Sequence, residues 1–459
     1  MYINIQSEDT IVAVSSPLGI GGVAVIRCSG GKTFSIVRSL FFRKDKSVWN
    51  WERIRYRYLY YGIIADNNDV VDEVMVSLFR APRSYTGEDM AEVYCHGSVY
   101  VQQKILQMFI DRGARLAEAG EFTIRAYLNG KMNLAEAEAI GDIIHSYSEA
   151  AHRLAIEQLR GGYVPMIRQL REDILNFASL LELELDFSEE DVEFANREQL
   201  MELLMRNIQK ISELTQSFQL GNAIKSGVPV AIIGHPNAGK STLLNALLNE
   251  EKAIVSDIPG TTRDLIEDKL IINGIMFRII DTAGIREAKD EIEKIGIERA
   301  VLSIKQAMIV IILRDVNEDE DEWEELVELV KRNNAEACVI KVFNKIDKRE
   351  MYENKGDIIG ISAKNKWNIE VLKNKLYEAV VSKGYKMNQP LVSNVRHYNE
   401  LKQALYFLER AMSGLKERRN IELIAEDLRF AIRHLSNITG NITSEDVLKN
   451  IFSKFCIGK

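Results

Sequence analysis

Hydrophobic positions follow a strand-like pattern over the first part of the chain and a helical pattern directly after it. Residues 1 to about 120 alternate short apolar runs with one helical stretch, which predicts an α/β or α+β domain. The predicted strands are Ile11–Val14, Val23–Arg27, Glu73–Phe79 and Ala91–His96, and the helix lies near Val101–Arg112.

From about Glu121 to Gln219, apolar residues recur at steps of three and four, which predicts amphipathic helices. The two clearest stripes are Ile167, Leu170, Ile174, Phe177 and Leu181, and Leu200, Leu203, Leu204, Ile208, Ile211, Leu214 and Phe218. The same period returns in Tyr398, Leu401, Leu405, Leu408, Met412 and Leu415, and Thr443 with Asp446 fits the capping box of a further helix. Because these stripes need an apolar partner, we expect the two helical flanks to pack against each other. We predict domains at residues 1–120, 121–221, 222–384 and 385–459, with the third inserted into one helical domain.

The middle segment repeats one arrangement, in which a short apolar run ends in a polar motif. Val228–Ile233 leads into Gly234–Ser241, which fits the pattern G-x-x-x-x-G-K-[ST] and is followed by a helical pattern at Thr242–Leu248. Glycines let backbone N–H groups close around phosphates, and the helix adds its positive N-terminal end. We expect Lys240 to reach the β- and γ-phosphates and the Ser241 hydroxyl to bind Mg²⁺. The segment predicts a doubly wound P-loop α/β domain that binds a nucleoside triphosphate.

Three later motifs indicate that the base is guanine. Each follows an apolar run, and they are Asp281–Gly284, Asn344–Asp347 and Ser362–Lys364. A carboxylate at Asp347 can accept two hydrogen bonds from the N1–H and the exocyclic amine of guanine, a donor pair that adenine lacks. The predicted GTP-binding residues are Asn237, Ala238, Gly239, Lys240, Ser241, Thr242, Ser256, Asp257, Ile258, Pro259, Gly260, Thr261, Thr262, Asp281, Thr282, Ala283, Gly284, Asn344, Lys345, Asp347, Ser362, Ala363 and Lys364.

The residues for hydrolysis depart from the Ras arrangement. A Ras-like enzyme carries a Gln directly after the Asp-x-x-Gly motif, and here Ile285, which cannot orient water, takes that position. In Ser256–Asp264 a Thr can coordinate Mg²⁺ when the γ-phosphate is present, and the oxygen ligands there together with Asn237 favour an additional monovalent cation. Carboxylates that can position water, or else remain solvated surface charges, are Glu287, Asp290, Glu291 and Glu293.

Four segments, taken together, carry a resemblance to a known family. They are Ser256–Asp264, Asp281–Glu287, Glu293–Ala300 and the ending Phe455–Lys459. They resemble the MnmE (TrmE) family, the tRNA-modifying GTPases of bacteria and organelles, and the resemblance begins at Asp9–Ala13 and extends to the last residue. It implies an N-terminal tetrahydrofolate-binding domain, a helical domain and an inserted Ras-like G domain. It also implies a homodimer whose G domains meet across their nucleotides during K⁺-stimulated hydrolysis of GTP.

The same resemblance implies roles for individual residues. K⁺ would be held by Asn237, Ser256, Ile258 and Thr261, and Mg²⁺ by Ser241 and Thr262. A 5-formyl- or 5,10-methylene-tetrahydrofolate would be held by Arg27, Glu92, Lys131 and Lys459, each of which is otherwise an ordinary surface or ion-paired charge. The expected catalytic residues are Glu293, Lys240 and Cys456, of which Cys456 is otherwise an ordinary thiol.

The resemblance further implies a partner, the flavin enzyme MnmG, which uses NADH. Together the two proteins would add an aminomethyl-type group at C5 of the wobble uridine of certain tRNAs, with the one-carbon unit coming from the folate. Two other functions stay open, a ribosome-assembly GTPase and a signalling or scaffold GTPase. The first would need an added RNA-binding module, and the sequence offers no KH-type GXXG loop in a basic setting.

Composition bounds the class of protein. With 46% hydrophobic and 27% charged residues, the chain resembles an ordinary globular protein, and 459 residues correspond to roughly three domains of about 150 residues. No apolar run approaches the roughly 20 residues of a membrane span, and the N-terminus lacks the basic and then apolar pattern of a signal peptide. We therefore expect a cytoplasmic protein without a membrane partner. The net charge of -8 argues against non-specific coating of nucleic acid. A local basic patch remains open, since Lys416, Arg418 and Arg419 can contact tRNA phosphates or form a solvated helix end.

Overall fold

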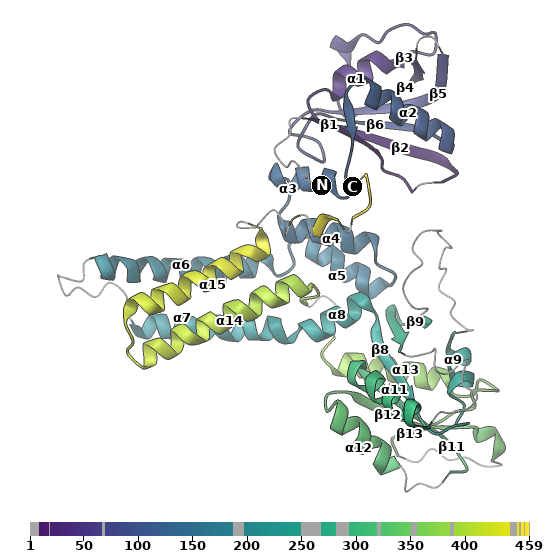
Figure 1. The fold of residues 1–459 in the computed structure, drawn as a ribbon, viewed down its shortest axis with the longest axis vertical. Coiled ribbons are helices and arrows are strands. Elements are labelled where there is room, and N and C mark those ends of the chain that lie inside the picture. The colour runs from purple at the N-terminus through teal and green to yellow at the C-terminus, as the bar shows by residue number, and fades with distance from the viewer. Residues whose placement is uncertain are drawn as a thin grey trace. The chain divides into compact units, whose positions relative to one another are not determined.

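The computed structural model describes most of the chain, which Figure 1 shows as a ribbon. The described residues are 9–17, 19–66, 69–186, 197–248, 268–280, 293–318, 323–349, 356–385, 390–440, 448, 451–453 and 455–458. Among these, the side chains of residues 185–186, 268 and 293–297 lie outside the description. The chain forms two compact units, one of Met1–Gly141 with Ser436–Lys459 and one of Asp142–Leu435.

The first unit is built on a seven-stranded sheet. Its strands are β1 Thr10–Val14, β2 Gly21–Ser29, β3 Phe41–Phe42, β4 Leu59–Asp66, β5 Asp69–Phe79, β6 Met90–Gly97 and β7 Ala114–Leu116. Its helical elements are α1 Thr33–Leu40, η1 Trp51–Arg53, α2 Val99–Asp111, α3 Glu121–Leu128 and most of α4 Leu134–Ile144. The strand order is β3-β4-β5-β6-β2-β1-β7, in which β1 and β7 pair in parallel and the other neighbours pair antiparallel.

Alternation along β1 sorts its side chains onto the two faces of this sheet, because successive residues of a strand point to opposite sides. Val12 lies in the core cluster that also contains Ile36 of α1 and Ile105 of α2. Its neighbour Ile11 belongs to a separate cluster with Phe122 of α3. Helices α1 and α2 therefore cover one face, while α3 covers the other face near β1.

The C-terminal residues pack within the first unit. Phe452 and Phe455 share a buried cluster with Ile124 of α3, and their ring centroids lie 5.2 Å apart. Ile457 forms an isolated bridge with Ala119. The backbone of residue 458 then approaches β1 so closely that a Cβ on this glycine would lie 2.3 Å from the Val14 carbonyl oxygen.

The second unit contains a doubly wound sheet and a set of long helices. Its strands are β8 Val228–Ile233, β9 Asp268–Ile272, β10 Ile275–Ile279, β11 Ile309–Asp315, β12 Cys338–Asn344 and β13 Ile358–Gly360. Its helical elements are α5 Glu149–Leu159, α6 Val164–Asp186, α7 Arg197–Gln216, α8 Phe218–Ser226, α9 Lys240–Leu248, α11 Glu293–Gln306, α12 Trp323–Asn333, η4 Ile346–Lys348, α13 Ile369–Ser382, α14 Val395–Lys416 and α15 Ile421–Thr439, the last of which ends in the first unit.

The sheet of the second unit has helices on both faces. Its order is β13-β12-β11-β8-β10-β9, and every pair is parallel except the β9–β10 hairpin. One face packs on α9 and α13, and the other packs on α11 and α12. Parallel strands covered on both faces read as continuous apolar runs, which explains why the sequence marks a strand such as β8 by the run Val228–Ile233.

The long helices flank this sheet in sequence and lie together in space. Helices α7 and α14 lie side by side, within the group of α6, α7, α14 and α15 that Figure 1 shows. The buried positions of α7 include Leu204 and Ile211, and those of α14 include Leu401 and Leu408. The two flanks thus bury their apolar stripes against each other, as the sequence predicted.

The β9–β10 hairpin of the sheet packs on helix α5. The Ala150 amide, at the start of α5, donates a hydrogen bond of 2.9 Å to the carbonyl of Gly274, which lies in the β9–β10 turn. Lys269 of β9 places its ammonium 5.6 Å from the ring centroid of Tyr147. Ala150 and Leu154 of α5 also belong to the same core cluster as the sheet.

The predicted fold class, an N-terminal α/β part, helices and an inserted doubly wound α/β part, is confirmed. One detail is wrong: Phe218 continues the apolar stripe of α7 in sequence, but α7 ends at Gln216 and Phe218 opens α8. The four domain boundaries stay predictions. The capping box at Thr443 lies outside the described residues. Within the described part of the chain, no helix combines the length and apolar character needed to cross a bilayer.

Candidate functional site

The loop after β8 has the backbone that a phosphate cradle requires. Gly234 has φ +153, and a Cβ there would lie 2.0 Å from the Leu313 carbonyl oxygen of β11. Gly239 has φ +96, and a Cβ there would lie 2.3 Å from Asn344 Nδ2. Only glycine fits either position, because the first is closed by a neighbouring strand and the second by a side chain and a left-handed backbone.

Lys240, the first residue of α9, folds back over this loop. Its Nζ donates to the Gly234 carbonyl at 2.7 Å and to the His235 carbonyl at 2.8 Å. Burial lowers the pKa of this ammonium, and Glu318 partly offsets the effect. Both of these hydrogen-bond partners are carbonyl oxygens, which phosphate oxygens can replace. Ser241 and Thr242 follow in the first turn of α9, where backbone N–H groups are unpaired within the helix.

Asn344, at the end of β12, joins three loops through its side-chain amide. Nδ2 donates to the Ala238 carbonyl at 2.9 Å, and Oδ1 accepts from the Lys345 amide at 2.8 Å and the Ala363 amide at 2.9 Å. The residue is only 2% exposed. The phosphate loop and the two segments predicted to hold the base are therefore fixed to one another by a single buried amide.

Lys345 and Asp315 add a second link. Lys345 has φ +67, and its Nζ donates to the Asn237 carbonyl at 2.7 Å and lies 2.8 Å from Asp315 Oδ2. Desolvation raises the pKa of Asp315, but hydrogen bonds from Lys345 and the Asn317 amide outweigh it and hold the pKa below its usual value. Asp315 was not among the predicted residues. Its position at the end of β11, two positions after the apolar run Ile309–Leu313, was the available signal.

The predicted base-reading carboxylate lies beside the last motif. Asp347 Oδ1 accepts a hydrogen bond from the Ser362 hydroxyl at 2.5 Å, and the same hydroxyl accepts from the Asn365 amide at 3.2 Å. Ser362 and Ala363 are buried, whereas Lys364 is exposed. The structure thus brings Asn237, Ala238, Gly239 and Lys240 together with Asn344, Lys345, Asp347, Ser362 and Ala363.

Apart from Ser241, Thr242 and Lys364, the other predicted nucleotide and cation residues lie outside the described residues or lack a described side chain. Those outside the described part of the chain are Ser256, Asp257, Ile258, Pro259, Gly260, Thr261, Thr262, Asp281, Thr282, Ala283 and Gly284, with the carboxylates Glu287, Asp290 and Glu291. Glu293 begins α11, but its side chain is not described.

In the first unit, two of the predicted folate residues form an ion pair. Arg27 of β2 lies directly opposite Glu92 of β6, and Arg27 Nη2 is 2.9 Å from Glu92 Oε1. The guanidinium carbon lies 5.2 Å from the Tyr85 ring centroid and 5.7 Å from that of Phe122. Tyr94 donates to the other oxygen of Glu92 at 2.7 Å, and desolvation together with this bond raises the pKa of Tyr94 to about 12.

The chain end approaches this pair. Arg27 Nη1 donates to the Gly458 carbonyl at 3.5 Å, which also accepts from the Ser15 hydroxyl at 2.9 Å. Lys459 lies outside the described residues. Lys131 is exposed and donates to the Pro82 carbonyl at 2.9 Å, three residues before Tyr85. Cys456 is exposed, and its carbonyl accepts from the Gly120 amide at 3.4 Å.

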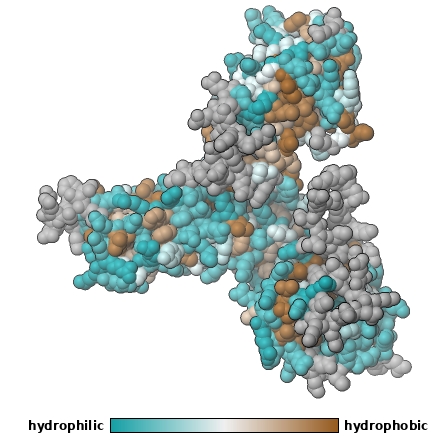
Figure 2. Space-filling model, in the orientation of Figure 1, coloured by the Kyte–Doolittle hydropathy of each residue, from teal (hydrophilic) through white to brown (hydrophobic). Residues whose placement is uncertain are grey.

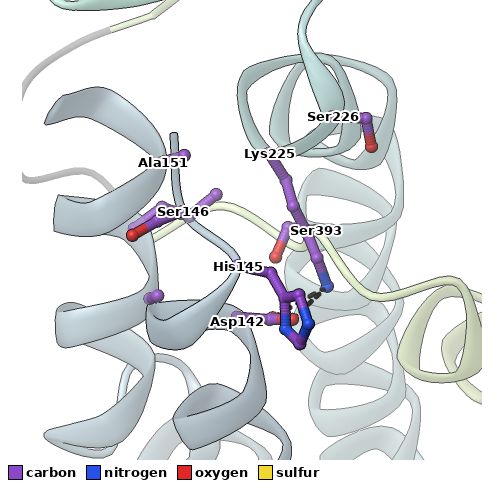
Figure 3. A pocket seen from close by; sticks show the side chains of 9 residues that line it. Asp142, His145, Ser146, Ala151, Lys225, Ser226 and Ser393 are labelled. Atoms are coloured by element: carbon purple, nitrogen blue, oxygen red, sulfur yellow. Dashed lines mark hydrogen bonds and ion pairs between the residues drawn. The ribbon is translucent and has the colours of Figure 1, made fainter. Parts of the chain in front are cut away.

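A cavity of about 150 Å³ lies in the second unit, where the chain enters and leaves the doubly wound sheet. It is lined by Asp142, His145, Ser146, Ala151, Leu154, Ala155, Lys225, Ser226 and Ser393. Lys225 Nζ lies 2.7 Å from Asp142 Oδ1, and Figure 3 shows the His145 ring beside this pair. None of the predicted site residues that the structure describes lines this cavity, whose lining comes from the segments that connect the sheet to the helices.

Comparison with known proteins identifies the family. The model of the MnmE helical domain matches residues 134–456, and that of the GTP-binding protein TrmE N-terminus matches residues 10–131. A tRNA modification GTPase MnmE from Cytophaga hutchinsonii is 49% identical over 456 residues, which cover 98% of each chain. The protein of the same name from Flavobacterium johnsoniae is 47% identical over 99% of this chain and 100% of its own. This chain belongs to the MnmE family.

The family defines the activity at the level of the reaction class. Its members with nearly full-length similarity are tRNA modification GTPases, so the chain is a GTP hydrolase that acts in tRNA modification. A solved structure, Era in complex with MgGDPNP and a segment of 16S ribosomal RNA, matches 39% of this chain and 66% of its own at 26% identity and a TM-score of 0.26. The assignment rests on the family models and the curated relatives, not on that partial match.

Proposed function

We propose that this chain hydrolyses GTP in a K⁺-stimulated reaction and thereby supports the addition of an aminomethyl-type group at C5 of the wobble uridine of certain tRNAs. The partner in this proposal is a flavin enzyme of the MnmG kind, and the one-carbon donor is 5-formyl- or 5,10-methylene-tetrahydrofolate. The observation that carries the proposal is similarity over 98% of the chain to a tRNA modification GTPase. A homodimer whose two G domains meet across the nucleotides completes it.

The nucleotide part of the proposal has support in the geometry of the described residues. Lys240 holds two carbonyls that phosphate oxygens can replace, and Ser241 begins the same helix. Asp347 has one oxygen engaged by Ser362 at 2.5 Å, which orients the carboxylate for the two donors of guanine. Ser241 with Thr262 would hold Mg²⁺, which neutralises charge on the β- and γ-phosphates.

The monovalent cation is the distinctive part. Asn237, Ser256, Ile258 and Thr261 would supply its oxygen ligands, and Glu293 would act on water. Ile285 cannot orient water as the Ras glutamine does, so the chain needs another source of stabilisation. A cation beside the phosphates supplies positive charge of the kind that an arginine finger supplies elsewhere, an effect of about 10³–10⁵ in rate. Asn237 has φ +67, which turns its backbone sharply at the tip of the phosphate loop.

The test compares GTP turnover by the full chain in KCl and in NaCl at equal ionic strength. We expect a several-fold higher turnover in KCl. Asn237→Gly tolerates the left-handed backbone but lacks the side-chain oxygen, so it should lose the preference for KCl while still binding nucleotide. His235→Ala, two residues away and exposed in the same loop, is the matched control and should keep the preference. Equal turnover of the wild type in both salts would reject K⁺ stimulation.

The folate part rests on the ion pair of the first unit. The guanidinium of Arg27 lies beside the rings of Tyr85 and Phe122, and the side chains of Arg27 and Glu92 are 17% and 13% exposed. A cation and a carboxylate in a largely desolvated setting fit a ligand that carries both glutamate carboxylates and an N–H edge on its pterin. Lys131 and Lys459 would add positive charge. We propose these four residues as the folate site. Cys456 lies three residues before Lys459 in the chain.

A further inference from the structure

Helix α14 carries aromatic and basic side chains in alternation along one stripe. Tyr398, Lys402, Tyr406 and Arg410 follow one another at intervals of four residues, which places them on the same face of the helix. Lys402 Nζ lies 5.7 Å from the Tyr398 ring centroid. Arg410 Cζ lies 5.6 Å from the ring centroid of Tyr406. Each cation therefore lies over the ring one turn before it.

The part of this stripe formed by Tyr406 and Arg410 is exposed and is held in place by contacts with α15. Tyr406 is 52% exposed, and the side chain of Arg410 is 48% exposed. Asp427 of α15, only 9% exposed, lies 3.1 Å from Arg410 Nη2 and fixes the guanidinium over the ring. Phe407, next to Tyr406, stacks on Phe430 of α15 with ring centroids 4.9 Å apart. The tyrosine ring and the guanidinium plane thus stand open to solvent on a rigid support.

Charge along this helix differs in sign from that of the whole chain. Residues 395–420 contain six Lys or Arg and three Glu, a net charge of +3, whereas the chain carries -8. Two of the glutamates are engaged: Glu400 accepts from His434 at 2.8 Å and Glu417 accepts from Arg419 at 2.9 Å. The exposed residues Lys416 and Arg418 lie where the stripe ends. An acidic protein has collected positive charge beside stacking groups.

We propose that the exposed part of the α14 stripe, Lys402, Tyr406 and Arg410 with Lys416, Arg418 and Arg419 at its end, is an RNA-binding surface. Unpaired bases stack on aromatic rings and on arginine guanidinium planes, and nearby cations contact the phosphates. Such a surface needs no apolar groove, and Figure 2 shows mainly hydrophilic residues on the visible face of the group α6, α7, α14 and α15. The inference rests on the proposed function in taking a tRNA as the RNA.

The experiment measures binding of a fluorescently labelled, unmodified tRNA transcript to the full chain by anisotropy over a series of KCl concentrations. Tyr406→Leu should weaken binding about tenfold, because it removes a stacking ring, whereas Tyr406→Phe should bind like the wild type. Lys402→Ala should lower the slope of log affinity against log salt by about one, because one phosphate contact is lost. If Tyr406 had only a structural role, Tyr406→Leu and Tyr406→Phe would not differ in RNA affinity while having the same GTP turnover.

Matched controls sit elsewhere on the surface. Tyr100→Ala removes a tyrosine that is 71% exposed on α2, and Arg332→Ala removes a basic side chain that is 75% exposed on α12. Both should leave tRNA affinity and salt slope unchanged. GTP turnover should be the same in all these variants, since α14 contributes no residue to the proposed nucleotide site.

Three outcomes would overturn this inference, and the first of them leaves the proposed function intact. If the wild type binds the transcript and Tyr406→Leu and Lys402→Ala bind it equally well, the α14 surface is wrong and the tRNA function stands. If the wild type does not bind the transcript at any salt concentration, the inference is overturned along with direct tRNA contact by this chain. Unchanged RNA affinity combined with loss of binding to the flavin partner would make α14 a protein-docking surface instead.

Discussion

Asn344 illustrates how one side chain can hold a binding site together. The sequence motif predicts that this residue lies near the nucleotide. It does not predict that the side-chain amide forms hydrogen bonds with three backbone groups. Its role here is to fix the phosphate loop to the segments at Lys345 and Ala363. Each buried backbone group left without a partner costs about 1–3 kcal/mol.

We therefore expect Asn344→Ala to lower the unfolding temperature and to weaken GTP binding at least tenfold, since both loops lose their anchor. Calorimetry and titration with a fluorescent GTP analogue measure the two effects. Asn365→Ala is the matched control, because Asn365 is exposed and its hydrogen bond to Ser362 uses its backbone amide, not its side chain. An Asn344→Ala protein that melts and binds like the wild type would show that the three bonds are dispensable.

Residue-level pairing was the part that the sequence could not predict. Arg27 and Glu92 were expected to serve one ligand, but their direct ion pair follows from the antiparallel register of β2 and β6. Asp315 reaches Lys345 because β11 and β12 are neighbours whose last residues, Asp315 and Asn344, lie opposite each other. Strand order and register arise from tertiary packing, and no local pattern in the sequence encodes them.

At the scale of elements, local periodicity predicted several strands and helices of the described chain, among them β8, α6, α7 and α14. It failed where packing overrides the period. The stripe of α7 continues through Phe218, yet Ser217 separates α7 from α8. The Ser217 hydroxyl donates to the Leu214 carbonyl at 2.7 Å and accepts from the Val392 amide at 3.1 Å. Val392 lies 175 positions away in the chain, so this contact at the interruption is one that no local pattern encodes.

Substitutions in the β9–β10 hairpin can test how much the contact between the sheet and α5 contributes to stability. Gly274 has φ +78, and a Cβ there would lie 3.2 Å from Glu149 Cβ. Gly274→Ala should lower the unfolding temperature by more than Gly356→Ala does. Gly356 also has a positive φ, +55, but nothing lies within 4 Å of a Cβ there. Backbone strain alone costs about 1 kcal/mol at either glycine, so the excess reports the contact with α5.

Calorimetry of the two variants and the wild type measures this difference. Equal losses at the two glycines would mean that the hairpin does not depend on its contact with α5. A larger drop in unfolding temperature for Gly274→Ala than for Gly356→Ala would show that the hairpin is stabilised by its contact with α5. This hairpin directly precedes the predicted Asp281–Gly284 motif in the chain.

At the scale of the whole molecule, the two proposed ligand sites belong to different compact units. Arg27 and Glu92 lie in the first unit, whereas Lys240, Asn344 and Asp347 lie in the second. The apolar pattern changes from strand-like to helical near residue 120, whereas the first unit extends to Gly141 and includes the last residues of the chain. The grouping of the last residues with the first unit was not predicted, since it depends on Phe452 and Phe455 entering the core beside Ile124.

Separate units allow one site to be removed without the other. We expect Arg27→Ala combined with Lys131→Ala to weaken binding of 5-formyl-tetrahydrofolate about tenfold or more in calorimetry, because charge-assisted hydrogen bonds to the ligand are lost. GTP turnover in KCl should stay within about twofold of the wild type, because no nucleotide residue belongs to the first unit. Arg112→Ala breaks another ion pair of the first unit, with Asp66 at 3.0 Å, and should leave folate affinity unchanged. Unchanged folate affinity in the double variant would remove the one-carbon site from Arg27 and Lys131 without touching the GTPase assignment.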